Sequence, residues 1–374
     1  MAGALRIEFG WFVPTYGDSR VVGDPGAMEP PSLDLFVRVA RAAEDAGFDY
    51  ALVPVATECW DAWIATAMVA ARTSSLTMLC AARPGLIAPT VMAKMVATFD
   101  RLTEGRVAVN LIAGGGEAEM AADGLHPSGG SAGSDGSAGA AGSAHDERYA
   151  LMDETVALMK ASWAARAPFD WDGRFFTVRR GDVRPKPFQQ PHPPFYIGGI
   201  SDAAVEVGAR HADVYLYWGN TVNQIAADIA KVRARAAVEG RDAQLRHGMR
   251  FQVLVRETEA EAWRDAHGLL ARDAQRARAH RMGGRMGAQS EADARMRRLA
   301  VETAGDDWRI GPHLWAGLTT VRHGAGVMIV GNPEQVAGTI QSYVELGCTT
   351  FCLSGYPHDE EARRFGDLVL PAFR

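Results

Sequence analysis

The chain has few cysteines, no large excess of charge and none of the common catalytic motifs, and each shortage removes a class of protein. Its 374 residues include only four cysteines, Cys59, Cys80, Cys348 and Cys352. No two pairs of them have the spacing of a zinc site, so we expect buried, reduced thiols rather than metal ligands. The net charge of −6 argues against general nucleic-acid binding through a basic surface.

Long apolar runs are also missing. No stretch approaches the roughly 18 apolar residues of a membrane span, and Met1–Phe9 lacks the basic patch and apolar core of a secretory signal. We therefore expect a cytoplasmic protein. A hydrophobic content of 47% over 374 residues is enough for a large core, in one α/β barrel or two smaller domains.

Sequence motifs for several enzyme classes are absent as well. The chain has no serine nucleophile elbow, no zinc-binding His-Glu helix and no Walker loop. No expected strand is followed by a dinucleotide-binding fingerprint, because Gly114-Gly115-Gly116 lacks its spacing. A metal hydrolase is a weak third option, since no His/Asp cluster is expected at the strand ends.

What the sequence does contain is an alternation of short apolar strands and helical patterns. Eight strands are expected at 6–13, 50–53, 76–82, 107–112, 195–197, 213–217, 248–256 and 350–353. Helical patterns follow at 33–46, 60–72, 90–102, 146–166, 202–210, 223–239, 259–270, 334–346 and 360–373. Short apolar strands suit burial on both faces. We therefore predict a single (β/α)₈ barrel over residues 1–374, with a doubly wound sheet as the runner-up.

Three segments go beyond a minimal barrel. Residues 169–178 are typical of a hairpin around Asp172-Gly173. Residues 128–144 are almost purely Gly, Ser and Ala, which predicts a flexible insert. Residues 272–323 are long enough for a mobile lid at the C-terminal face of the barrel, and the alternative is surface without a role.

Polar and aromatic residues follow most of the expected strands, and in a barrel those strand ends converge on one mouth. Arg250 and Gln252 lie two apart on one strand, so both point to the same side. Arg250 stands among apolar neighbours, where burying it requires an anion. That anion is either a bound ligand or an internal Asp or Glu, and the sequence leaves both open.

Two turns after strands stand out. Gly198-Gly199-Ile200-Ser201 exposes backbone N–H groups at a helix start, which fits either a phosphate cradle or a plain turn. The last strand is followed by the turn Ser354–Ala362, which carries Tyr356 and His358. Each of these two residues has either a structural or a catalytic role.

Several motifs in order resemble the bacterial luciferase-like flavin monooxygenases, and most closely their organosulfonate branch. The resemblance covers nearly the whole chain, through Trp11–Asp18, Cys59–Trp63, Thr98–Arg106, Ala121–Gly124, His145–Tyr149, Leu216–Gly219, Leu314–Gly317, Val321–Gly326 and Ser354–Ala362. The family implies a barrel that uses reduced FMN and O₂, with the FMN supplied by a separate NAD(P)H-dependent flavin reductase. We also expect a homodimer or homotetramer.

The resemblance assigns roles residue by residue. Matched residues with an active-site role are Cys59, Trp218, Arg322, Tyr356 and His358. Those expected to bind the substrate are Tyr16, Trp218, Arg250, Gln252 and Arg322, and those expected to hold FMN are Asn110, His145, Tyr149, Gly199 and Ser201. The implied reaction cleaves a C–S bond and releases sulfite and a carbonyl product.

The chain departs from the alkanesulfonate enzymes at several points. Tyr16 and Gln252 stand where those enzymes tend to carry His, and Val55–Glu58 differs from their pattern after the second strand. The Glu8–Phe12 opening is more similar to the sulfoquinovose enzymes. We therefore expect an alkanesulfonate or sulfoquinovose as substrate. The alternatives are a luciferase-like or deazaflavin-dependent enzyme acting on a non-sulfonate, and a non-catalytic flavin carrier or sensor.

Overall fold

Eight parallel strands form a closed barrel in the computed structural model, which describes residues 6–113, 117–124, 141–270, 291–322 and 324–374. Each of the eight strands pairs in parallel with the next one around the ring. The last strand also pairs with the first, which closes the ring. The strands in order are β1 (Glu8–Phe12), β4 (Tyr50–Val53), β5 (Thr77–Ala82), β6 (Val107–Leu111), β9 (Phe195–Ile197), β10 (Val214–Trp218), β11 (Arg246–Val255) and β14 (Cys348–Ser354). The predicted (β/α)₈ barrel is confirmed, and the doubly wound sheet is excluded by the closure.

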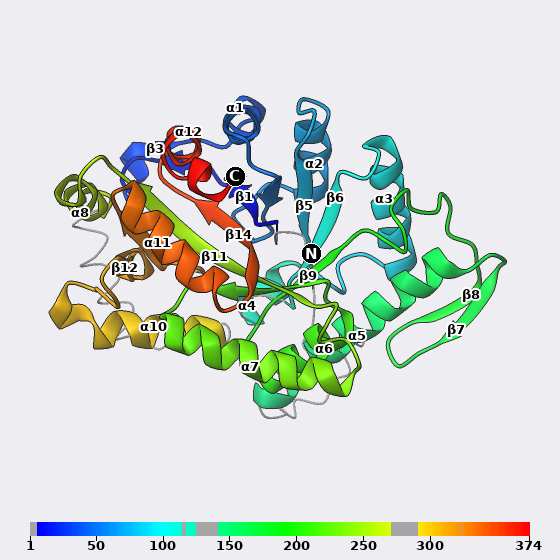
Figure 1. The fold of residues 1–374 in the computed structure, drawn as a ribbon. Helices are drawn as coiled ribbons and strands as arrows, with labels where there is room; N and C mark the ends of the chain where they lie inside the picture. The colour runs from blue at the N-terminus through cyan, green and yellow to red at the C-terminus, as the bar shows by residue number, and fades with distance from the viewer. Residues whose placement is uncertain (1–5, 114–116, 125–140, 271–290, 323) are drawn as a thin grey trace, which may run out of the picture.

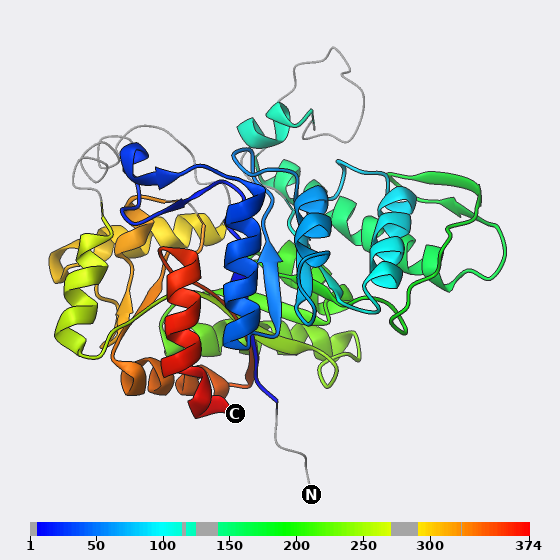
Figure 2. The ribbon, with the colours of Figure 1, turned by 90° about the horizontal axis from the view of Figure 1, so that it is seen from above.

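Helices surround the strands, as Figures 1 and 2 show. They are α1 (Leu33–Ala46), α2 (Ala62–Ala70), α3 (Pro89–Leu102), α5 (Ala141–Ala164), α6 (Asp202–His211), α7 (Val222–Val238), α8 (Glu259–Gly268), α11 (Pro333–Val344) and α12 (His358–Leu368). Local sequence sets their ends. In α1 the Ser32 hydroxyl accepts a hydrogen bond from the Leu35 N–H, and Gly47 ends the helix in the left-handed region at φ 89°.

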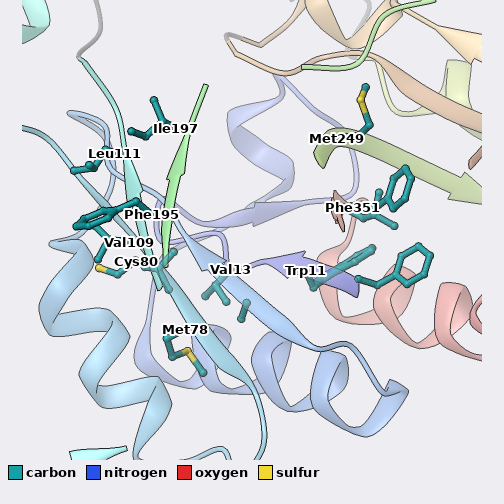
Figure 3. Close-up of a cluster of buried hydrophobic side chains, with 14 of the residues drawn as sticks. Trp11, Val13, Met78, Cys80, Val109, Leu111, Phe195, Ile197, Met249 and Phe351 are labelled. Atoms are coloured by element: carbon teal, nitrogen blue, oxygen red, sulfur yellow. The ribbon is translucent and has the colours of Figure 1, made fainter. Parts of the chain in front are cut away.

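The barrel strands bury side chains on both faces. One set, which includes Trp11, Val109, Phe195 and Met249, belongs to the largest cluster of buried apolar side chains (Figure 3). The alternate residues form a second cluster inside the ring, with Phe12, Tyr50, Leu52, Leu79, Ala108, Tyr196, Val214, Leu216 and Cys352. This alternation explains why the strands are apolar throughout.

The expected hairpin is present, and parts of the two expected insertions lie outside the described residues. Strands β7 (Phe169–Asp172) and β8 (Thr177–Gly181) form the expected hairpin at the periphery of the molecule (Figure 1). Of the expected insert 128–144, residues 128–140 lie outside the described residues and the last four begin α5. Of the expected lid 272–323, residues 272–290 and 323 lie outside the described residues.

The described part of the expected lid segment is folded onto the barrel. It contains α10 (Glu291–Glu302) and β12 (Leu314–Trp315), and β12 pairs antiparallel with β13 (Met328–Gly331). Strand β13 pairs in parallel with the second half of β11, so it extends the sheet beyond the ring. The short helix α4 (Glu117–Ala122) and the strands β2 (Asp18–Ser19) and β3 (Met28–Glu29) complete the fold. No described helix has the length and apolar character needed to cross a membrane.

Candidate active site

A cavity of about 560 Å³ lies at the C-terminal ends of the barrel strands. Its walls come from the segments after most strands, and α10, Arg322, Gly324 and Ala325 contribute further walls. The predicted site residues that line it are Tyr16, Cys59, Asn110, His145, Tyr149, Gly199, Ser201, Trp218, Arg250 and Arg322. The predicted residues Gln252, Tyr356 and His358 do not line it, although all three lie next to residues that do. We call this space the central cavity.

Arg250 is a buried cation on the wall of the central cavity. It lies on β11 with 4% of its surface exposed, and its guanidinium stands 5.0 Å from the centre of the Phe12 ring. It donates to the Ser354 hydroxyl at 2.7 Å and to the backbone carbonyl of Phe251. Burial lowers the pKa of Arg250, and the nearby positive charge of Arg322 also acts to lower it. A guanidinium nevertheless keeps its proton in proteins, so a positive charge is held here.

No carboxylate among the described residues forms an ion pair with Arg250, in contrast with two other arginines of the cavity wall. Arg83 donates to Glu119 at 2.7 Å and to Asp123 at 2.5 Å, and Arg295 donates to Asp228 at 2.8 Å. Of the two anions that the sequence left open for Arg250, the described structure supplies no internal one. Because an uncompensated buried charge is costly, the Arg250 side of the cavity is suited to an anionic ligand.

Arg322 also lies on the cavity wall, where it bonds to one of two neighbouring tyrosines. Its Nη1 donates to the Tyr356 hydroxyl at 2.8 Å, and that hydroxyl lies 3.5 Å from the hydroxyl of Tyr16. The pKa of Tyr16 is raised well above its usual value because the phenol is buried. Tyr356 does not itself line the cavity, but its two hydrogen-bonding neighbours, Tyr16 and Arg322, both do.

His358, for which the resemblance implies an active-site role, is not among the residues that line the cavity. It is fully buried at the first position of α12, and its Nδ1 lies 2.7 Å from Oδ1 of Asp18. Its backbone N–H donates to the other Asp18 oxygen at 2.7 Å. Burial by itself would raise the pKa of Asp18, but the bonds to His358 and Ser19 lower it below the usual range. The ring stacks edge-on to Tyr356, with the two ring centres 4.8 Å apart.

Gln252 was expected to contact the substrate, but it is fully buried behind the cavity wall. Its Oε1 accepts from the Ser354 hydroxyl at 2.6 Å, and its Nε2 donates to the Ala325 carbonyl at 3.1 Å. The expectation that Arg250 and Gln252 point to the same side holds, since both reach Ser354. Sequence periodicity places them on one side of β11 but does not give their depth.

A second part of the cavity has the features of a phosphate site. Ser201 caps α6, and its hydroxyl accepts from the Ala204 N–H at 3.2 Å. Gly199 has φ +141°, and a Cβ there would lie 2.5 Å from the Ala204 Cβ and 2.9 Å from the Tyr149 hydroxyl. The backbone is thus bare where the start of a ten-residue helix meets the cavity. Helix N-termini of this kind bind phosphate groups.

The other residues expected to hold FMN lie in the same cavity. Asn110 is on β6, and the His145 and Tyr149 rings are neighbours on α5 with centres 5.1 Å apart. Burial raises the pKa of Tyr149 to about 12, so its phenol stays protonated. Trp218 lines the cavity at the end of β10. Asn110 and Trp218 lie at or near strand ends, where the order of the strands places them, whereas His145 and Tyr149 were expected only from the family resemblance.

Sequence reasoning gave no role to several residues of this region, among them Asp228 and Arg295, which line the cavity, and Asp18, which bonds to His358. Asp18 lies in the segment after β1, and its partner His358 lies 340 positions later in the chain. No local pattern links the two residues. The Trp11–Asp18 motif includes Asp18, but the motif gives it no role by itself.

A model of the luciferase-like monooxygenase family matches residues 7–350. The chain belongs to this family. Among solved structures, it is similar to riboflavin lyase in complex with modified FMN and riboflavin, with a TM-score of 0.78, 20% identity, and coverage of 99% of this chain and 91% of that one.

Two other solved structures have the same fold as this luciferase-like protein. EDTA monooxygenase from Chelativorans sp. BNC1 has a TM-score of 0.76 and 18% identity, covering 98% of this chain and 93% of that one. The coenzyme F420-dependent tetrahydromethanopterin reductase from Methanopyrus kandleri has a TM-score of 0.66 and 18% identity, covering 99% and 100%. Family membership makes the chain an enzyme of the luciferase-like monooxygenase type, and likeness at these identities adds only the fold.

Proposed function

We propose that this enzyme is a two-component organosulfonate monooxygenase that uses reduced FMN and O₂. The observation that carries the proposal is the buried Arg250, which lies on the wall of the central cavity with no ion-paired carboxylate among the described residues. Arg322 lines the same cavity. A sulfonate is a permanent anion with three oxygen acceptors, so two guanidinium groups and neighbouring phenols suit it.

The FMN site fits the residues present. The bare backbone at Gly199 and the start of α6 would hold the phosphate, and Tyr149, Ser201, His145 and Asn110 line the space beside it. When bound, reduced flavin supplies two electrons and activates O₂. Two proteins of the same fold, the riboflavin lyase with its modified FMN and the F420-dependent reductase, agree with a flavin-type cofactor. The proposal includes a separate NAD(P)H-dependent reductase because the resemblance to the organosulfonate enzymes implies one.

The chain's own residues would prepare the sulfonate for attack. Arg250 and Arg322 offset its negative charge and fix its orientation in the cavity. The Tyr356 hydroxyl, which accepts from Arg322 and lies near Tyr16, is better placed than the fully buried His358 to hold a proton for the product. In the balanced reaction one oxygen atom of O₂ enters the carbonyl product and the other leaves as water. The C–S bond breaks to give sulfite.

The test supplies the enzyme with FMN, a flavin reductase and NADH in air, together with a panel of alkanesulfonates and sulfoquinovose. Sulfite is then measured. We expect sulfite from at least one sulfonate, and we expect Arg322→Ala to abolish it while circular dichroism shows an intact fold. Arg250→Ala should weaken sulfonate binding more than FMN binding. Equal losses for the two ligands would instead assign Arg250 to the flavin phosphate.

A second candidate function is oxidation of a non-sulfonate by a flavin or a deazaflavin, and the similarity to the F420-dependent reductase favours it. The two proposals separate cleanly. Absence of sulfite with every sulfonate, together with oxidation of reduced deazaflavin or of another substrate, would reject the desulfonating activity.

Light scattering of the purified enzyme tests the predicted homodimer or homotetramer.

A further inference from the structure

The side chain of Gln252 forms hydrogen bonds to two residues, and each of these is linked to one of the two cavity arginines. Gln252 lies on β11 two positions after Arg250, and none of its surface is exposed. One end of its amide bonds to Ser354, which also bonds to Arg250. The other end bonds to the carbonyl of Ala325, three positions after Arg322.

The directions of these bonds fix the orientation of the amide. A guanidinium can only donate, so the Ser354 hydroxyl must accept from Arg250 at 2.7 Å. The single hydroxyl proton of Ser354 is then left for Gln252 Oε1, 2.6 Å away. The NH₂ group of Gln252 therefore faces Ala325, whose carbonyl can only accept, at 3.1 Å. Each donor in this chain of bonds faces an acceptor.

The backbone of Gln252 holds the same segment. Its N–H donates to the Val327 carbonyl at 2.9 Å, where β13 begins to pair with β11. Backbone and side chain together attach residues 325–327 to the strand that carries Arg250. Arg322 has its own attachment, from its backbone N–H to the Leu318 carbonyl and from its guanidinium to Tyr356.

We propose that Gln252 is a positioning residue that sets the placement of Arg250 relative to Arg322, and not a substrate ligand. This inference rests on the proposed anion site. It also gives a reason for glutamine at this position: an amide offers an acceptor to Ser354 and a donor to Ala325 without adding a charge beside two guanidinium groups. Glutamate would keep the acceptor but lose the donor, and would place a carboxylate near Arg250.

The experiment measures binding without turnover. The enzyme is titrated calorimetrically with ethanesulfonate in the presence of reduced FMN and in the absence of O₂, and FMN affinity is measured separately. Gln252→Met keeps the shape of the side chain but removes both of its hydrogen bonds. We expect about a tenfold weaker ethanesulfonate affinity, the size of effect that one or two net hydrogen bonds produce, and unchanged FMN affinity.

Two further variants make the result specific. In an Arg322→Ala background, Gln252→Met should have a much smaller effect, because the placement of Arg322 no longer matters. Ser354→Ala keeps Gln252 but breaks its link to Arg250, so it also reports on the proposal if Gln252→Met fails to fold. The matched control is Gln189→Met. Its amide donates to Asp100 at 2.7 Å and to the Val107 carbonyl at 2.8 Å, and it does not line the cavity.

The outcomes separate this inference from the proposed function. If Arg250→Ala loses ethanesulfonate binding but Gln252→Met and Ser354→Ala keep it, the positioning role is rejected and the anion site stands. The role is also rejected if Gln189→Met weakens binding as much as Gln252→Met. If the wild type binds no ethanesulfonate, or Arg250→Ala binds it as well as the wild type, the anion site itself fails and the inference falls with it.

Discussion

Cys59 lines the central cavity as a neutral thiol. Burial raises its pKa to about 11, above the ordinary value of 9.0. Only the thiolate is a strong nucleophile, so covalent catalysis by Cys59 at neutral pH would be very slow. We therefore expect Cys59 to take part in the site as a neutral hydrogen-bonding thiol and not as a nucleophile.

This protonation state can be measured chemically. Near pH 7.5, iodoacetamide should alkylate Cys59 in the folded enzyme about 100-fold more slowly than the same residue in urea, because the thiolate fraction falls tenfold for each unit of pKa. Mass spectrometry of the Cys59 peptide over time gives both rates. Equal rates in the folded and unfolded enzyme would show that the thiol is not shielded in this way.

Single residues differ in how well the sequence predicts them. Asn110, Trp218 and Arg250 were identified because they lie on or at the end of barrel strands, and the order of strands alone brings such residues together. The period of two placed Gln252 on the same side as Arg250, but a period gives direction and not burial, so it could not show that Gln252 is fully buried. The Asp18–His358 pair depends on a contact across 340 positions, which one sequence does not reveal.

The Asp18–His358 pair joins two elements, the segment after β1 and the start of α12. Asp18 is 3% exposed. Its carboxylate accepts hydrogen bonds from the backbone N–H of His358 and from Nδ1 of the His358 ring, each at 2.7 Å. The segment after β1 also carries Tyr16, and the turn before α12 carries Tyr356. The pair therefore holds together the two segments whose phenols meet beside Arg322.

Breaking this pair should destabilise the fold. Asp18→Ala leaves the buried His358 without its carboxylate, and we expect a loss of about 3 kcal/mol in the free energy of unfolding measured with urea at pH 7. The exposed Asp45→Ala should change it by less than about 0.5 kcal/mol. The pKa of folded Asp18 is lowered. Its contribution is thus present above the unfolded value of about 3.9 and is lost as pH falls through the lower folded pKa. Similar urea midpoints for the two variants at pH 7 would contradict the pair's role.

Elements with complete local signals were predicted well, and those in or next to the expected lid segment were not. Helix α1 was placed at its observed bounds, because it has a complete apolar face, a Ser32 cap and a Gly47 stop. Strands β12 and β13 were missed, since β12 lies inside the segment assigned to the lid and β13 follows shortly after it. Helix α10 was not expected, because the segment 272–323 that contains it is rich in Arg, Met and Gly and was assigned as a whole to a lid.

At the scale of the whole molecule, the barrel leaves room for ligands at its C-terminal mouth and is filled below it. Interior side chains from most strands form one apolar cluster, which includes Tyr50, Leu79 and Tyr196. Gly10 on β1 makes room for this filling. A Cβ at Gly10 would lie 2.0 Å from a carbon of the Tyr50 ring, far inside van der Waals contact. A side chain at Gly10 would therefore force the Tyr50 ring to move.

Gly10→Ala should therefore lower the free energy of unfolding by about 1–3 kcal/mol, the usual cost of overpacking a core. The cost arises because the Tyr50 ring has to move within a closed ring of strands. Gly338→Ala is the matched control. Gly338 lies exposed on α11, and a Cβ added there would have nothing within 4 Å, so the same change should stabilise by about 0.5–1 kcal/mol. Urea unfolding followed by circular dichroism and by tryptophan fluorescence gives both values. We expect the two variants to change the free energy of unfolding in opposite directions. We also expect both probes to report the same transition, because one barrel should unfold as a unit. A neutral Gly10→Ala would show that the interior can repack without cost.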